Sequence, residues 1–182
     1  MKLQFKQLSL LSFALVSALA NAALDIGQTA PQFTVQVALA GNVSDYYLAD
    51  ELKKGPVVLY FFPMAFSGTC SIEAHNFAEA IGDFKKLGAT VIGVSRDDID
   101  TQKRFSVSEC RGKFAVAADT DQKVMKAYDA VLAMRPDYAN RVSYVIAPSG
   151  KIIYQYSSLN TAKHVQNTMN ALKEWSQTNL VK

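Results

Sequence analysis

Residues 56–74 read PVVLYFFPMAFSGTCSIEA. Their first part, residues 56–62, is an unbroken apolar run rich in β-branched and aromatic side chains, which is typical of a strand buried on both faces of a parallel sheet. From Cys70 the apolar residues recur at helical spacing as far as Gly88: Ile72, Phe77, Ile81 and Phe84. The stretch predicts a central strand followed at once by a helix that starts near Cys70.

The following segments repeat the alternation of strand and helix. Residues 89–95 (ATVIGVS) predict a second buried strand, and residues 97–112 predict a second helix, with acids at its front and Gly112 at its end. A short strand over 114–118 and a short helix over 122–128 come next, before an irregular stretch. This rhythm predicts a parallel sheet core.

The two ends of the domain have a different pattern. Residues 142–146 and 151–156 alternate in polarity around the turn APSGK and predict an antiparallel hairpin, followed by a closing helix over 161–177. Before the central strand, residues 32–37 predict an edge strand, and residues 40–55 a turn, a polar loop and one or two helical turns. The expected fold is one α/β domain with a mixed, mostly parallel sheet flanked by helices.

The N-terminus predicts export. Residues 1–22 carry Lys2 and Lys6, then an apolar stretch over 8–20, then a small-x-small site before Ala23. This is the pattern of a cleaved secretory signal peptide. A membrane anchor is the alternative, but the apolar stretch is shorter than the roughly 20 residues that a bilayer requires. The mature domain is expected to be residues 23–182, periplasmic or secreted, with no membrane attachment after cleavage.

Composition and charge exclude several classes of protein. The chain has 182 residues, 49% of them hydrophobic and 19% charged, which argues against a disordered tail or a collagen-like repeat. The formal charge of +3 falls to +1 once Lys2 and Lys6 are removed with residues 1–22, which hold no acid. Nothing in this balance indicates a nucleic-acid partner.

The chemistry is expected at Cys70, where a buried strand ends and a helix begins. Backbone N–H groups of the first helical turn and the helix dipole favour the thiolate there, which makes the sulfur a nucleophile. Ser67 is able to turn its hydroxyl toward the sulfur and an incoming oxygen, and Pro63 to shield the sulfur. Taken alone, Ser67 is better explained as a helix N-cap and Pro63 as a strand terminator, but beside Cys70 a small polar pocket is the favoured interpretation.

These residues carry a family resemblance. Pro63-Met-Ala-Phe-Ser67-Gly-Thr-Cys70 is similar to the Pro-x-x-x-Thr/Ser-x-x-Cys signature of peroxiredoxins, and the likeness continues in order through VIGVSRDD and RVSYVIAPSGKIIY over residues 25–176. The chain most resembles the bacterioferritin-comigratory-protein subgroup, the peroxiredoxin Q type. The resemblance implies a thioredoxin-like fold and a thiol peroxidase that reduces hydrogen peroxide and organic hydroperoxides, with Cys70 as the peroxidatic cysteine.

Arg141 is then the candidate for the family's catalytic arginine. The strand after it should run antiparallel, so Arg141 should emerge at the sheet edge where the parallel strands end, beside Cys70. A guanidinium there would stabilise the thiolate and hold both peroxide oxygens. Arg135 and Arg96 are lower-ranked alternatives. Glu73 is expected to orient an arginine rather than transfer protons, or else to act as a first-turn dipole partner.

A sulfenic acid at Cys70 must condense with a thiol to be recycled, and Cys110 is the only other cysteine. The sequence departs from one pattern of the subgroup, because His75 stands five residues after Cys70 where those members have a second cysteine. Cys110, near the end of the next helix, resembles members that resolve from that helix; the alternative is an inert free thiol. If the sulfurs lie far apart, one of the two helices must unwind locally.

The implied partners are a peroxide and a thioredoxin-like or other dithiol reductant in the same compartment, and the protein is expected to be a monomer or weak dimer. No cofactor is expected. His75 and His164 have no partner at metal-ligand spacing, which favours surface or capping roles. Two other functions remain open: an exported thiol-disulfide oxidoreductase, although no Cys-x-x-Cys is present, and a non-enzymatic binding module with a structural disulfide.

Overall fold

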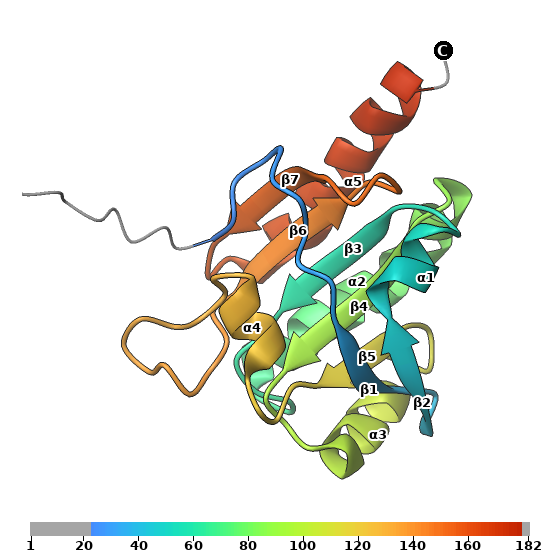
Figure 1. Cartoon of the computed structure of the whole chain (residues 1–182). Coiled ribbons are helices and arrows are strands. Elements are labelled where there is room, and N and C mark those ends of the chain that lie inside the picture. The colour runs from blue at the N-terminus through green and yellow to red at the C-terminus, as the bar shows by residue number, and fades with distance from the viewer. Residues whose placement is uncertain (1–22, 180–182) are drawn as a thin grey trace, which may run out of the picture.

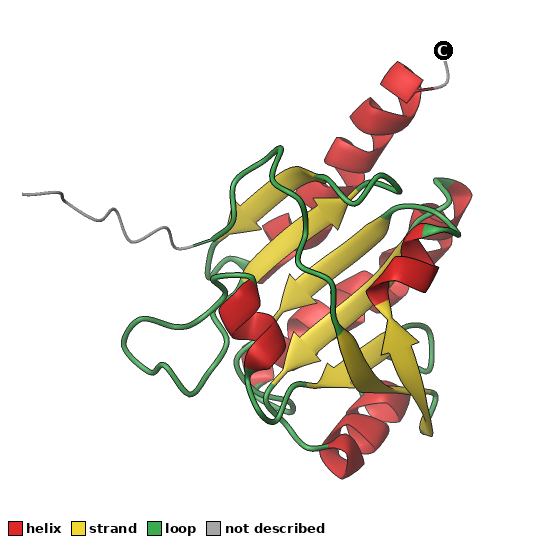
Figure 2. Cartoon of the chain, viewed as in Figure 1, coloured by secondary structure: helices red, strands yellow, loops and turns green. Residues whose placement is uncertain are grey.

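The computed structural model describes residues 23–179, which form one seven-stranded mixed sheet with helices on both faces (Figures 1 and 2). The strand order is β2-β1-β5-β4-β3-β6-β7. This confirms the predicted α/β class with a mixed central sheet. The predicted signal peptide, residues 1–22, lies outside the described residues, as do residues 180–182.

The strands are β1 (Thr34–Leu39), β2 (Asn42–Tyr47), β3 (Val57–Phe61), β4 (Thr90–Ser95), β5 (Ala115–Ala118), β6 (Val142–Ile146) and β7 (Ile152–Ser157). The helices are α1 (Leu48–Leu52), α2 (Gly68–Lys86), α3 (Ile99–Ser108), α4 (Lys123–Ala127) and α5 (Thr161–Asn179). β3, β4 and β5 are parallel neighbours, and β6 pairs antiparallel with both β3 and β7. The predicted parallel core and C-terminal hairpin are therefore confirmed.

β3 lies at the centre because its side chains are apolar on both faces, and all of its residues are buried. Leu59 and Phe61 pack into one core cluster with residues of α1 and α4, whereas Val58 and Tyr60 pack into a second cluster with α2, α3 and α5. Figure 2 shows the two helical layers with the sheet between them. A strand covered in this way has no polar face, which is why it reads as one apolar run.

The N-terminal strands differ from the expectation. The predicted edge strand over 32–37 is the internal β1, which pairs with β2 on one side and β5 on the other. The true edge is β2, in the segment where the sequence predicts a polar loop. Five of its six residues are exposed, since it has a sheet neighbour on one side only and little covers its faces. An edge strand of this kind lacks the apolar alternation that identifies strands from sequence.

The second predicted helix is also shorter than expected. α3 ends at Ser108, and the chain turns back through Glu109, Cys110 and Arg111, where the N–H of Gly112 donates to the carbonyl of Ser106. Arg111 and Gly112 both have positive φ, the geometry with which many helices terminate. Cys110 therefore lies in the turn after the helix and not in its last turn.

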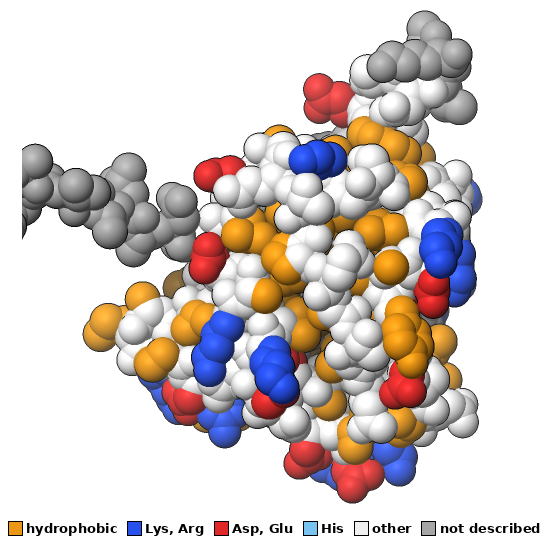
Figure 3. Space-filling model, viewed as in Figure 1, with side chains coloured by type: hydrophobic (Ala, Val, Ile, Leu, Met, Phe, Trp, Pro, Cys, Tyr) orange, Lys and Arg blue, Asp and Glu red, His pale blue; other side chains and the backbone are white. Residues whose placement is uncertain are grey.

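Charges are mixed on the surface. On the face shown in Figure 3, basic and acidic side chains are interspersed and do not gather into a patch of one sign. In residues 23–179, no helix is both long enough and apolar enough to span a membrane.

Close packing of Tyr60 over Gly93 generates a stability prediction. A Cβ at Gly93 would lie 2.7–2.9 Å from atoms of the Tyr60 ring, which cannot retreat because it stacks on Phe77 with ring centroids 4.4 Å apart. Gly93→Ala should lower the free energy of unfolding by about 1–3 kcal/mol. Gly82→Ala is the matched control, since Gly82 lies in α2 with open space around it, and it should raise stability by up to about 1 kcal/mol. Urea unfolding measures both, and equal effects would contradict the packing argument.

Candidate active site

Cys70 lies in the first turn of α2, just beyond the carboxyl end of β3. Cys70 is only 2% exposed, so its sulfur is largely shielded from bulk water. The helix begins at Gly68 after the N-cap Ser67, and its first-turn N–H groups point toward this end of the sheet. The position predicted from the sequence is the one observed.

The loop between β3 and α2 is anchored by β4. The N–H of Ala65 donates to Asp97 Oδ2 at 2.8 Å, and Ser95 Oγ donates to the same oxygen at 2.6 Å. Phe66 adopts a positive φ of 61° and packs edge-on against Phe105, with ring centroids 5.3 Å apart. A non-glycine residue in this conformation needs support from its surroundings. Asp97, which no sequence motif marks, provides part of that support.

Arg141 reaches Cys70 from the neighbouring strand. It immediately precedes Val142, which pairs with Phe61 in the antiparallel β3–β6 ladder. Its Nη2 atom lies 3.3 Å from Cys70 Sγ and 3.3 Å from Thr69 Oγ1. A guanidinium at this distance favours the negative charge of a thiolate.

The two alternative arginines lie elsewhere. Arg96 pairs with Asp137, with Nη1 and Oδ2 2.7 Å apart. Arg96 and Arg135 each place their guanidinium over the ring of Tyr138, at 4.9 and 4.1 Å from its centroid. Of the three candidates, the structure brings Arg141 to the sulfur.

Glu73 holds Arg141 in place. Its Oε2 accepts a hydrogen bond from Arg141 Nη1, and the two residues are 0% and 3% exposed. Burial raises the pKa of Glu73, while the charge and the hydrogen bond of Arg141 act in the opposite direction and favour the ionised carboxylate. The contact fixes the direction in which the guanidinium points, which is the orienting function expected of Glu73.

His164 is part of the same buried cluster, which contradicts the expected surface role. It is fully buried on α5. Its Nε2 lies 2.8 Å from the carbonyl oxygen of Ser158 and must donate to it, so its Nδ1, 2.8 Å from Ser143 Oγ, accepts from that hydroxyl. Burial lowers the pKa of His164 to about 4, which keeps the ring neutral at pH 7. Nδ1 lies 3.9 Å from Glu73 Oε1, so this neutral ring packs beside the Arg141–Glu73 pair.

Ser67 and Pro63 lie on the loop that leads to Cys70. Ser67 has the backbone conformation of an N-cap, but its side chain makes no capping hydrogen bond, which leaves the hydroxyl available. Pro63 is partly buried and follows Phe62 directly. Their roles toward the sulfur and a substrate remain predictions.

Cys110 is a free thiol in the core cluster that also contains Cys70. It is 0% exposed. Burial, and secondly Glu109, raises the pKa of Cys110 far above its usual value. In the folded state Cys110 is thus a protonated, shielded thiol.

Two polar contacts fasten the Cys110 turn to α2, one on each side of the cysteine, and the one made by Arg111 is an ion pair. Glu109 Oε2 lies 3.1 Å from His75 Nε2, and Arg111 Nη1 lies 3.3 Å from Glu79 Oε1. His75 and Glu79 are four residues apart and so lie on one face of the helix. His75 is five residues beyond Cys70, a rise of about 8 Å along α2. These contacts hold the Cys110 turn against α2, the helix that carries Cys70, and no disulfide links the two cysteines.

Fold and site together define a thioredoxin-like protein with a cysteine–arginine site of the peroxiredoxin class. The chain belongs to the AhpC/TSA family, whose model matches residues 26–155, and its relatives are peroxiredoxins of the Q and bcp type.

The relatives cover most of the described domain. The chain is 30% identical to the chloroplastic peroxiredoxin Q of Gentiana triflora, over 81% of this chain and 66% of that protein, so it spans slightly less than two thirds of the length of these plant relatives. It is 29% identical to a peroxiredoxin named bcp from Helicobacter pylori, over 82% of this chain and 98% of that protein. The structure of a Xylella fastidiosa peroxiredoxin Q has the same fold, with a TM-score of 0.75 at 24% identity over 84% of this chain and 98% of that one.

The ion pair between Arg111 and Glu79 leads to a prediction about the exposure of the Cys110 thiol. In a Cys70→Ser background, Arg111→Glu should increase the rate at which Cys110 is alkylated about two- to fivefold, because an exposed ion pair contributes up to about 1 kcal/mol to keeping the turn closed. Combining Arg111→Glu with Glu79→Arg restores opposite charges and should restore the slow rate. Labelling with iodoacetamide in native buffer measures this.

A control variant separates the Arg111–Glu79 ion pair from a general effect of charge. Arg104→Glu makes the same change of charge on α3, and within residues 23–179 the Arg104 side chain hydrogen-bonds to Thr101 and forms no ion pair. Its labelling rate should match the parent. If the charge-swapped variant were labelled as fast as Arg111→Glu alone, the ion pair would not hold the turn.

Proposed function

We propose that this chain is a thiol peroxidase that reduces hydrogen peroxide and organic hydroperoxides through Cys70. The observation that carries the proposal is the placement of Arg141 Nη2 at 3.3 Å from the buried Cys70 sulfur. A thiolate at this position attacks the terminal oxygen of the peroxide, the O–O bond breaks, and the departing oxygen takes up a proton to leave as water or an alcohol. Cys70 is oxidised to a sulfenic acid.

Each side chain around Cys70 supports that step. Arg141 stabilises the thiolate and the negative charge that develops on the departing oxygen, in a setting from which water is largely excluded. Glu73 keeps the guanidinium aimed at the sulfur. The free hydroxyl of Ser67 supplies a hydrogen bond to the substrate, and Pro63 shields the sulfur.

Cys110 is proposed as the resolving cysteine. Its sulfur attacks the sulfenic sulfur of Cys70, the S–O bond breaks, and water leaves as an intramolecular disulfide forms. A dithiol reductant, thioredoxin-like in class, then reduces this disulfide by exchange. Burial keeps Cys110 protonated in the closed state, so the turn must open before the thiol reacts.

The two alternative functions lack support. An oxidoreductase of the Cys-x-x-Cys type needs a second cysteine at the helix end, but Glu73 is committed there to Arg141. A permanent structural disulfide is not supported either, since both cysteines are free and packed in the core.

Variants of Cys70 and the arginines test the peroxidase directly. Cys70→Ser should abolish peroxide consumption, since a hydroxyl is too weakly acidic to attack an O–O bond. Arg141→Ala should lower the second-order rate constant about 10²- to 10³-fold by removing a charge-stabilising donor, whereas Arg135→Ala should leave it within about twofold. Stopped-flow measurement of peroxide consumption gives these constants.

One further variant guards against misfolding. Arg141→Ala leaves Glu73 buried without its partner, so Arg141→Lys, which keeps the charge but not the two separate Nη donors to Glu73 and Cys70, should fall between Arg141→Ala and the parent. Circular dichroism verifies that each variant is folded. Turnover by Cys70→Ser, or a larger loss in Arg135→Ala than in Arg141→Ala, would overturn the assignment.

The resolving step has its own prediction. After one equivalent of peroxide, the parent should contain an intramolecular Cys70–Cys110 disulfide, and Cys110→Ser should accumulate a sulfenic acid at Cys70 that dimedone traps and that over-oxidises sooner. Peptide mapping without reduction identifies the bond. Intermolecular disulfides alone, or a free Cys110 in the oxidised parent, would show that the enzyme depends on an external thiol instead.

Export is proposed from the signal-like residues 1–22. The mature protein should be recovered from the extracytoplasmic fraction with Ala23 as its first residue, as N-terminal sequencing would show. Ala22→Asp places an acid where cleavage needs a small residue and should leave the leader attached. A chain that retains Met1 in the parent would contradict the proposal.

A further inference from the structure

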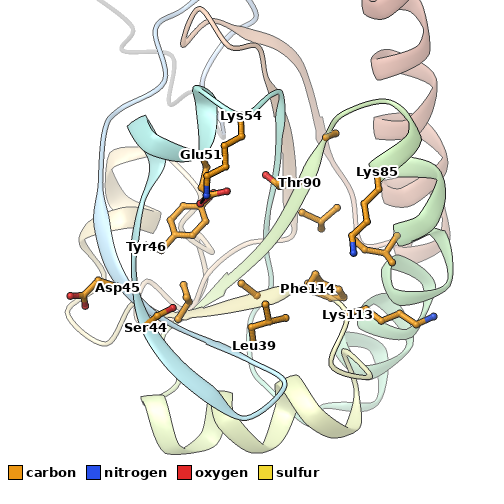
Figure 4. A pocket seen from close by; sticks show the side chains of 15 residues that line it. Leu39, Ser44, Asp45, Tyr46, Glu51, Lys54, Lys85, Thr90, Lys113 and Phe114 are labelled. Atoms are coloured by element: carbon orange, nitrogen blue, oxygen red, sulfur yellow. Dashed lines mark hydrogen bonds and ion pairs between the residues drawn. The ribbon is translucent and has the colours of Figure 1, made fainter.

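A hollow opens at the end of the sheet that lies away from Cys70, where β4 begins (Figure 4). The β1–β5 ladder has only two residue pairs, and β5 joins β4 from Ile92 onward, so Thr90 and Val91 extend beyond the start of β5. β1, β2 and α1 diverge from β4 there and leave a cavity of about 360 Å³. This volume lies within the range of small-molecule sites.

The hollow is separate from the peroxide site. α2 connects the two, with Cys70 in its first turn and Ile81 in the wall of the cavity. Ile81 lies eleven positions beyond Cys70, a rise of about 16 Å along the helix axis. A molecule bound in the hollow therefore does not touch Cys70, and the inference does not rest on the peroxidase.

About half of the lining residues are apolar. Val37 belongs to one core cluster and Ile81, Val91 and Phe114 to the other, because the cavity passes around the end of β5 from one face of the sheet to the other. The exposed side chain of Leu39 also lines it. A ligand that fits this wall has an apolar body.

Two hydroxyl groups in the wall lack partners. Tyr46 Oη and Thr90 Oγ1 are buried, line the same cavity and make no hydrogen bond to the protein. Tyr46 is only 8% exposed. Burial, with Glu51 nearby, raises the pKa of Tyr46, so its hydroxyl remains protonated and able to donate. An unpaired buried hydroxyl is unfavourable, and a ligand oxygen would satisfy it.

Among the charged lining residues that form no ion pair within residues 23–179, lysines outnumber acids. Lys54 is bound to Glu51 at 2.6 Å, and Asp45 is an exposed acid of the lining. Lys85 and Lys113 also line the cavity, and neither forms an ion pair within residues 23–179. In Figure 4, Thr90 is drawn between Tyr46 on the β2 side and Lys85 on the α2 side.

We propose that this hollow binds a small amphipathic carboxylate, such as a medium-chain fatty acid. The apolar chain lies against Ile81, Val91 and Phe114. The carboxylate accepts hydrogen bonds from the hydroxyls of Tyr46 and Thr90 and faces the ammonium group of Lys85.

Calorimetric titration of the full mature chain with decanoate and with decanol tests the proposal. Decanoate should bind once per chain. Decanol, which lacks the charge, should bind at least about tenfold more weakly. Lys85→Gln and Tyr46→Phe should each weaken decanoate binding about three- to tenfold, and Lys85→Gln should leave decanol unchanged. Lys86→Gln is the matched control, since Lys86 is the next residue of α2, is paired with Asp83 outside the cavity, and should have no effect.

Two further measurements make each outcome decisive. Cys70→Ser should bind decanoate like the parent, which separates this site from the peroxidase. Thermal unfolding confirms that the variants are folded. Binding of several decanoates per chain, equal affinity for decanol, no saturation below about 1 mM, or unchanged affinity in both Lys85→Gln and Tyr46→Phe would overturn the proposal.

Discussion

The buried contact between Arg141 and Glu73 is the interaction on which the rest of the site depends. It joins the first turns of α2 to the start of β6, two elements far apart in the chain. Breaking such a pair by removing one partner costs about 3–5 kcal/mol, because the remaining charge stays buried without compensation. The pair therefore fixes the arginine beside Cys70 and also fixes how α2 sits on the sheet. Neutral His164 behind it completes the wall without adding a third charge.

The two buried cysteines differ in the groups that surround them. Cys70 is shielded but lies beside a guanidinium and at a helix N-terminus, so its negative form has partners. Cys110 is equally buried among apolar side chains, and Glu109 is its acidic neighbour, so its negative form is strongly disfavoured. The same core that lets one sulfur react keeps the other unreactive. In the proposed mechanism, a conformational change therefore separates the two chemical steps.

Sequence patterns predicted the central elements because these elements are set by local periodicity. β3, α2 and the β6–β7 hairpin each have an uninterrupted apolar run, a helical repeat or a turn signal, and strand direction alone was enough to place Arg141 at the edge that holds Cys70. β2 was missed because an exposed edge strand carries little apolar alternation. The buried position of His164 and the anchoring role of Asp97 were not predicted, because both depend on contacts with residues distant in the sequence. Only the position of Asp97, just after a parallel strand, offered a signal.

The two ends of α3 are held with different strength, which determines where the protein opens. At the front, Asp98 caps the helix through the N–H of Thr101 at 2.7 Å, and buried Gln102 donates to Ser95 Oγ and to the carbonyl of Ala117. Ser95 and Asp97 in turn hold the loop that leads to Cys70. At the back, the partly exposed Arg111–Glu79 ion pair and the contact between Glu109 and His75, which contribute little each, hold the Cys110 turn. In the mechanism proposed above, opening therefore starts at the Cys110 end and leaves the anchored loop beside Cys70 in place.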